Sequence, residues 1–115
     1  MFKPTIDDVR QVLKEIEGIE RPDADNEGDP LNSPSVYNYL SDENQGKVDR
    51  AEEVLKDYVR NPEGGPNNRA ITELNKSGFT AHFNQDQDDP YRYVGSVSTR
   101  DWKVDVSDPS SGEDD

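Results

Sequence analysis

The chain contains no cysteine, and histidine, tryptophan and methionine each occur once in its 115 residues. Without cysteine it can form no disulfide, no thiolate metal site and no cysteine nucleophile. Long apolar runs are also missing. The N-terminal stretch MFKPTIDDVRQVLKEIEG carries charges where a signal peptide needs an unbroken apolar core, and no segment is long enough to cross a membrane. We therefore expect no membrane association and a protein that is either intracellular or assembled inside a cell.

Basic residues are scarce relative to acidic ones. The chain has 26 Asp and Glu against 13 Lys and Arg, which gives a net charge of -13 at pH 7. Proteins that bind DNA or RNA need the opposite balance, because much of their affinity comes from neutralising phosphates. The composition therefore argues against direct binding to nucleic acid.

Two interpretations fit the excess of acid. Leu, Ile, Val and Phe together make up 22 of the 115 residues, and a low apolar content with a high net charge is typical of disordered chains. Alternatively, the protein is adapted to molar salt, which screens repulsion between surface charges to within about 3 Å. Acidic residues occur in every expected element rather than in a tail alone, and this distribution favours salt adaptation.

Hydrophobic periodicity predicts three helices. Residues 5–18 form the first, with Thr5 as its N-cap. The second runs from residue 41 to about residue 60, and the third from residue 67 or 68 to about residue 84. The residues expected on the buried faces are Ile6, Val9, Val12, Leu13 and Ile16; Val48, Ala51, Leu55, Tyr58 and Val59; and Ala70, Ile71, Leu74, Gly78, Ala81 and either His82 or Phe83.

The remaining segments complete the expected fold. Residues 20–35 contain three prolines and no periodicity, which predicts a long exposed loop. From residue 91 the pattern alternates as in a β-strand, so residues 91–106 are expected to form a β-hairpin or an extended arm. Residues 107–115 are polar and acidic and are expected to be a disordered tail. The expected fold is a mainly α, single domain over residues 1–106: a small three-helix unit with a C-terminal β-hairpin or extended arm (α+β).

Three groups of residues could have a chemical role, and each has a simpler explanation. His82 has no second histidine for a metal site and no glycine-rich setting for hydrolysis, so we expect it to pack in a helix. The run DADNEGD (residues 23–29) begins like a calcium loop, but Pro34 occupies the twelfth position, where a glutamate should close the coordination shell. The aspartates of NQDQDDP (residues 84–90) lie in a polar turn without the burial that would make one an acid and another a base. We expect no catalytic, metal or cofactor site, and we expect that the protein is not an enzyme.

The last apolar segment, YVGSVSTRDWKVDV (residues 93–106), places the tryptophan just before the acidic end. A tryptophan in this place favours packing on another molecule. This segment, the triplet Ala-His-Phe at residues 81–83 and the order of the elements resemble the small head–tail connector (adaptor) proteins of tailed viruses. In that family the last helix often ends near an Ala-His-hydrophobic triplet, and a Gly-x-Val-x-Ser segment and a second valine-rich stretch follow. Residues 95–98 and 102–106 match these segments loosely, with Arg100 and Asp101 where the family has a glycine.

The resemblance implies a structural protein of the virion neck, assembled in the host cytoplasm. About a dozen copies would form a ring that joins the capsid portal to the tail and lines the DNA channel. An acidic wall would let DNA pass without binding, and the acidity would suit a virus of a halophilic archaeon. The implied partners are other copies, the portal protein and other connector or tail proteins. The residues expected at the subunit or portal interface are Tyr91, Tyr93, Val94, Val97, Trp102, Val104 and Val106.

A second hypothesis stays open beside the connector. In this hypothesis the protein is a small interaction module of a halophilic archaeon, whose acidic surface binds a basic partner. Particle size separates the two hypotheses, because a connector forms large closed rings whereas a module is a monomer or dimer.

Overall fold

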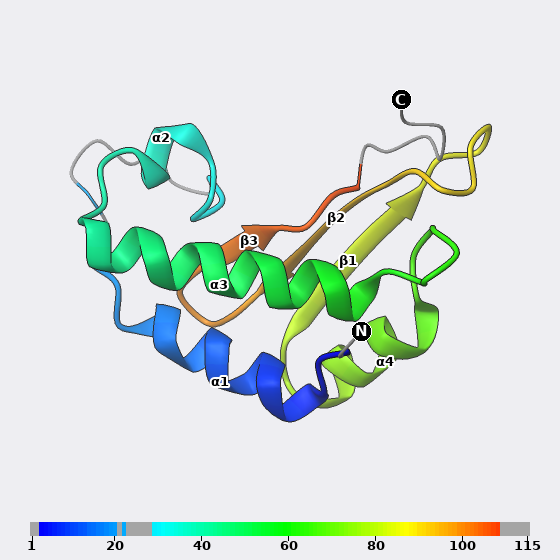
Figure 1. Cartoon of the computed structure of the whole chain (residues 1–115), viewed down its shortest axis with the longest axis horizontal. Helices are drawn as coiled ribbons and strands as arrows, with labels where there is room; N and C mark the ends of the chain where they lie inside the picture. The colour runs from blue at the N-terminus through cyan, green and yellow to red at the C-terminus, as the bar shows by residue number, and fades with distance from the viewer. Residues whose placement is uncertain (1–2, 21, 23–28, 109–115) are drawn as a thin grey trace.

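The computed structural model describes residues 3–20, 22 and 29–108, which fold into a mixed α+β domain (Figure 1). In this part of the chain the helices are α1 (Ile6–Glu17), α2 (Pro34–Tyr37), α3 (Asp42–Val59) and α4 (Asn68–Lys76), and the strands are β1 (Thr80–Gln85), β2 (Tyr93–Ser98) and β3 (Lys103–Asp105). The strands form one antiparallel sheet in the order β1-β2-β3. α1 and α3 pack side by side, and α3 crosses one face of the sheet.

The first two predicted helices are confirmed. α1 begins with a capping box, in which the Thr5 hydroxyl accepts from the Asp8 N–H at 3.3 Å and the Asp8 carboxylate accepts from the Thr5 N–H at 2.9 Å. α3 begins at Ser41, whose hydroxyl accepts from the Asn44 N–H. Each helix buries one apolar stripe in the common core: Val9, Val12, Leu13 and Ile16 from α1, and Val48, Ala51, Leu55, Tyr58 and Val59 from α3.

The third predicted helix is wrong in its second half. α4 ends early because Gly78 takes the left-handed conformation, with φ of 98°. The Gly78 N–H donates to the Asn75 carbonyl at 3.3 Å, and the Phe79 N–H donates to the Leu74 carbonyl at 3.2 Å. This pair of hydrogen bonds closes a helix C-terminus, and the chain then leaves as β1. The glycine is therefore a helix stop, not a bend inside a longer helix.

The sheet has a core face and an outer face. β1 pairs with β2 along its whole length, and β2 pairs with β3 over three residue pairs. Val97 and Val104 are direct partners on the core face, and both are fully buried. Gly95 is needed on the same face, because a Cβ at this position would collide with the Phe83 ring on the neighbouring strand. The sheet and the helices therefore share one hydrophobic core.

Trp102 belongs to this core as well. Its side chain is only 4% exposed, and its indole Nε1–H donates to the Ile19 carbonyl at 3.0 Å. The expectation that the tryptophan packs on another molecule is corrected here, because the C-terminal segment folds back onto the end of α1. The Ile19 carbonyl follows α1 and needs a hydrogen-bond donor, which the indole ring of Trp102 supplies.

The expected loop differs from the structure in its described part, and the expected tail differs at residues 107 and 108. In the described part of residues 20–35, Leu31 is fully buried, its N–H donates to the Lys103 carbonyl at 2.7 Å, and α2 follows. Asp108 exchanges two backbone hydrogen bonds with Tyr93, at 3.2 and 3.0 Å, so the ordered segment continues past residue 107. Residues 109–115 of the expected tail lie outside the described residues.

Candidate functional site

The residues expected at a subunit or portal interface divide into two groups. Five of them lie in the protein's own interior: Tyr93, Val97, Trp102, Val104 and Val106. Packing within the chain covers these side chains, so the expected interface arm is corrected to a part of the core. Tyr91 and Val94 are exposed, at 43% and 66% respectively, and are available for contact with a partner.

Val94 lies on the outer face of the sheet, which none of the described helices covers (Figure 1). The strand register places eight side chains on this face: Thr80, His82 and Asn84 from β1, Val94, Ser96 and Ser98 from β2, and Lys103 and Asp105 from β3. We call this set the open sheet face. It has one positive and one negative side chain, so it is electrically neutral with histidine uncharged, whereas the whole chain has a net charge of -13.

The β3 edge of the sheet is closed by the loop before α2. The Asn32 amide accepts from the Asp105 N–H at 2.9 Å and donates to the Asp105 carbonyl at 2.8 Å. The Leu31 N–H bonds the carbonyl two residues earlier in β3, at Lys103. An edge whose backbone groups are occupied in this way is protected from pairing with another strand.

The β1 edge is closed at one residue. The Asn75 amide accepts from the Ala81 N–H at 2.9 Å and donates to the Ala81 carbonyl at 3.4 Å. Since antiparallel pairing alternates, the backbone groups of Phe83 and Gln85 point toward the same edge, and in the described part of the chain they have no hydrogen-bond partner. The β1 edge is thus partly open.

His82 is not the helix-packing residue expected from the sequence. It lies exposed on β1, in one cross-strand row with Ser96 and Asp105. A Ser–His–Asp relay needs the histidine between the other two, whereas here the serine is in the middle. The Asp105 carboxylate instead accepts hydrogen bonds from the N–H and hydroxyl of Ser107, at 2.9 and 2.7 Å. The row therefore does not form such a relay.

The aspartates between β1 and β2 shape the hairpin turn. The Asp86 carboxylate accepts from the N–H groups of Asp88 and Asp89, at 2.7 and 3.2 Å, and the Asp89 carboxylate accepts from the Tyr91 N–H at 3.0 Å. The candidate calcium ligands at residues 23, 25 and 27 lie outside the described residues. Within the described ranges, no group of three or more acidic or histidine side chains is arranged to hold a metal ion.

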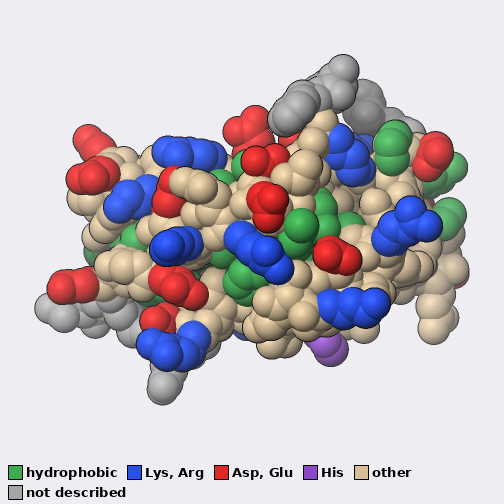
Figure 2. All heavy atoms as spheres, turned by 90° about the horizontal axis from the view of Figure 1, so that it is seen from below, with side chains coloured by type: hydrophobic (Ala, Val, Ile, Leu, Met, Phe, Trp, Pro, Cys, Tyr) green, Lys and Arg blue, Asp and Glu red, His purple; other side chains and the backbone are tan. Residues whose placement is uncertain are grey.

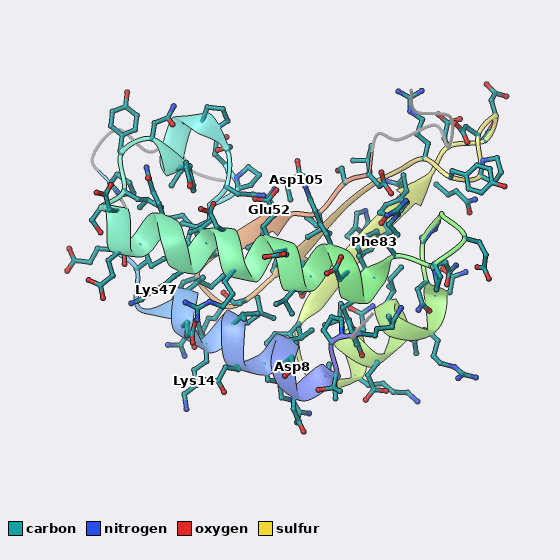
Figure 3. All side chains as sticks on the ribbon, in the orientation of Figure 1. Asp8, Lys14, Lys47, Glu52, Phe83 and Asp105 are labelled. Carbon is teal, nitrogen blue, oxygen red and sulfur yellow. The ribbon has the colours of Figure 1, made fainter. Side chains whose placement is uncertain are left out.

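The helical layer has a groove between α1 and α3, with a volume of about 440 Å³. Its lining consists of Pro4, Asp8, Gln11 and Val12 on one side and Arg50, Glu53, Val54 and Asp57 on the other. Figure 2 shows the molecule from below in the view of Figure 1, with apolar side chains visible between acidic and basic ones. In Figure 3, Asp8 marks the α1 side of the groove. The sequence pattern did not predict this groove, because Val54 is a single apolar residue on the polar face of α3.

Burial raises the pKa of Tyr58, and two further tyrosines have raised pKa values with different main causes. Burial raises the pKa of Tyr93 to about 12, and the nearby Asp108 carboxylate adds to the effect while Arg60 opposes it. The Tyr37 hydroxyl donates to the Asp49 carboxylate at 2.8 Å, and this hydrogen bond raises the Tyr37 pKa. Both groups are therefore neutral near pH 7 and serve packing and hydrogen bonding.

Comparison of the chain with protein families, with curated proteins and with solved structures gives no significant match. In the described part of the chain, no helix has the length and apolar character required to cross a membrane. The two surfaces that bear on function are the open sheet face and the groove between α1 and α3.

Proposed function

We propose that this protein is a structural subunit that associates with other copies of itself through the open sheet face. The supporting observation is the distribution of charge. Two copies that each have a net charge of -13 repel one another, and a neutral face is where they can meet at the lowest electrostatic cost. Val94, at 66% exposure, contributes apolar area that a second copy would cover.

The size of the face limits the strength of a single contact. Strand spacing and rise in ordinary sheets give this three-stranded face an area of about 300 Å². A stable interface buries about 800 Å² on each partner. Tyr91 is also exposed, but its ring lies against Gly64 in the connection between α3 and α4, so it does not add to this face. We therefore expect weak pairwise association that becomes strong when each copy makes more than one contact.

A ring is the more specific form of this proposal, and it comes from the resemblance to head–tail connectors. In a closed ring the open sheet face of one copy would bind a different surface on the next copy, and each copy would contact two neighbours. Closure compensates for a weak single contact, because the last contact forms between copies already held together. The ring would join the portal to the tail around the DNA channel, in a virus of a halophilic host.

The proposal is tested by particle size in molar KCl, measured by light scattering for the wild type and two variants. Val94→Glu places a charge on the open sheet face, and Tyr39→Glu is the matched control at a 63% exposed apolar residue next to α2. We expect the wild type and Tyr39→Glu to form multimers and Val94→Glu to be monomeric. A monomeric wild type at all concentrations contradicts the proposal, as does an equal effect of both substitutions.

The same measurement separates the specific forms. A closed particle of many copies supports the connector. A dimer supports self-association but contradicts the ring, and it favours the second hypothesis, a small acidic interaction module.

A further inference from the structure

We propose that the groove between α1 and α3 binds a basic amphipathic helix of a partner protein. The apolar side chains of that helix would lie on the groove floor, and its Lys or Arg side chains would lie at the acidic rim. This proposal concerns the helical layer and does not rest on self-association through the sheet.

The floor of the groove is apolar. Val12 is buried at its base, and Val54 and Pro4 are half-buried beside it. The groove has a volume of about 440 Å³. A helix that lays its apolar face between two helices uses a groove of this kind.

The rim of the groove is acidic. Glu53 and Asp57 lie one turn apart on α3, both are exposed, and neither has a salt bridge to another described residue. On α1 the Asp8 carboxylate caps the helix by accepting from the Thr5 N–H. Arg50 is the cation among the lining residues, but it already forms a salt bridge with Glu15 at 3.1 Å.

Charge complementarity selects the occupant. The rim carboxylates repel nucleic acid and acidic proteins, whereas they attract Lys and Arg. Because Glu53 and Asp57 are four residues apart on a helix, they match basic side chains one turn apart on a partner helix. An apolar floor between such charges favours a segment with one apolar face and basic flanks.

The test uses a fluorescent synthetic peptide of about 14 residues with Leu on one helical face and Lys elsewhere. The control peptide has Glu in place of Lys. Fluorescence anisotropy at moderate salt measures binding to the wild type, to the double variant Glu53→Gln with Asp57→Asn, and to the matched double variant Glu63→Gln with Asp88→Asn. The second pair removes the same two charges from exposed residues outside the groove.

We expect the Lys peptide to bind the wild type and the control variant with similar affinity. The groove variant should bind about fivefold more weakly, because it loses two exposed ion pairs. Val54→Thr, which keeps the shape of the side chain and makes the floor more polar, should also weaken binding. Circular dichroism of each variant verifies that the helices are intact. Equal weakening by both double variants would mean diffuse binding to an acidic surface, and equal binding of the Glu peptide would remove the charge argument; either result overturns the proposal.

Discussion

At each edge of the sheet, an asparagine side chain binds the backbone of the edge strand. The two asparagines differ in how far along the chain they lie from that strand. At β3, the Asn32 amide binds both backbone groups of Asp105, a residue 73 positions away. At β1, the Asn75 amide binds both backbone groups of Ala81, only six positions away. The β3 side has two further long-range ties, from Leu31 to the strand itself and from Trp102 to the Ile19 carbonyl. The β1 side is held locally and is partly open.

This difference separates what belongs to the fold from what is available to a partner. Contacts between the N-terminal and C-terminal halves hold β3, so disturbing them should loosen the whole domain. The β1 edge and the open sheet face lie outside the core, so a partner bound there would not disturb it. Three sets of substitutions test how far this contrast extends.

Replacing Trp102 should have the largest effect. Trp102→Ala removes a buried ring and leaves the Ile19 carbonyl without its donor, and substitutions of this kind cost about 3–5 kcal/mol. Tyr39→Ala, at an exposed aromatic residue, should change stability by less than about 0.5 kcal/mol. Urea unfolding in molar KCl measures both. A fully stable Trp102→Ala monomer that fails only in assembly would show that the tryptophan acts at an interface after all.

The two asparagines allow a direct comparison of the edges. Asn32→Ala should cost about 1–2 kcal/mol, because it releases the loop that buries Leu31, whereas Asn75→Ala should cost about 0.5 kcal/mol. Hydrogen exchange should become faster at the Asp105 and Leu31 amides in the first variant, and at the Ala81 amide alone in the second. If both variants lose the same stability, the long-range closure of β3 is no more important than the local closure of β1.

Alkaline pH tests the stability of the segment after β3, where Asp108 pairs with Tyr93 at the start of β2. The folded state raises the Tyr93 pKa to about 12, above the usual value of about 10. Stability from the neutral phenol is thus complete below pH 10 and is lost as pH rises from about 10 to about 12. Tyr93→Phe cannot ionise there, so its stability should fall less steeply than that of the wild type over this range. Parallel losses in thermal unfolding would show that Tyr93 ionises equally easily in both states.

The sequence predicted the elements that depend on neighbouring residues. Thr5 and Ser41 cap their helices, and the apolar stripes of α1 and α3 fall on the expected residues. Caps and helical periodicity act over a few residues, so they can be recognised without knowledge of the fold. The sequence also contained the signal that ends α4, since Gly78 closes the helix there, but the same glycine is compatible with a bend in a longer helix.

Distant contacts decided the rest. Residues 80–85 fit either a helix or a strand, and they form β1 because β2 supplies a partner for each of them. Trp102 lies in the core because the carbonyl of Ile19, 83 positions away, is placed within reach of its indole nitrogen. The neutral open sheet face and the α1–α3 groove combine residues from separate elements, so composition and periodicity could not reveal them. The sequence alone determined the acidity of the chain. Strand register and helix packing then decided which residues form the neutral sheet face and which form the acidic rim of the groove.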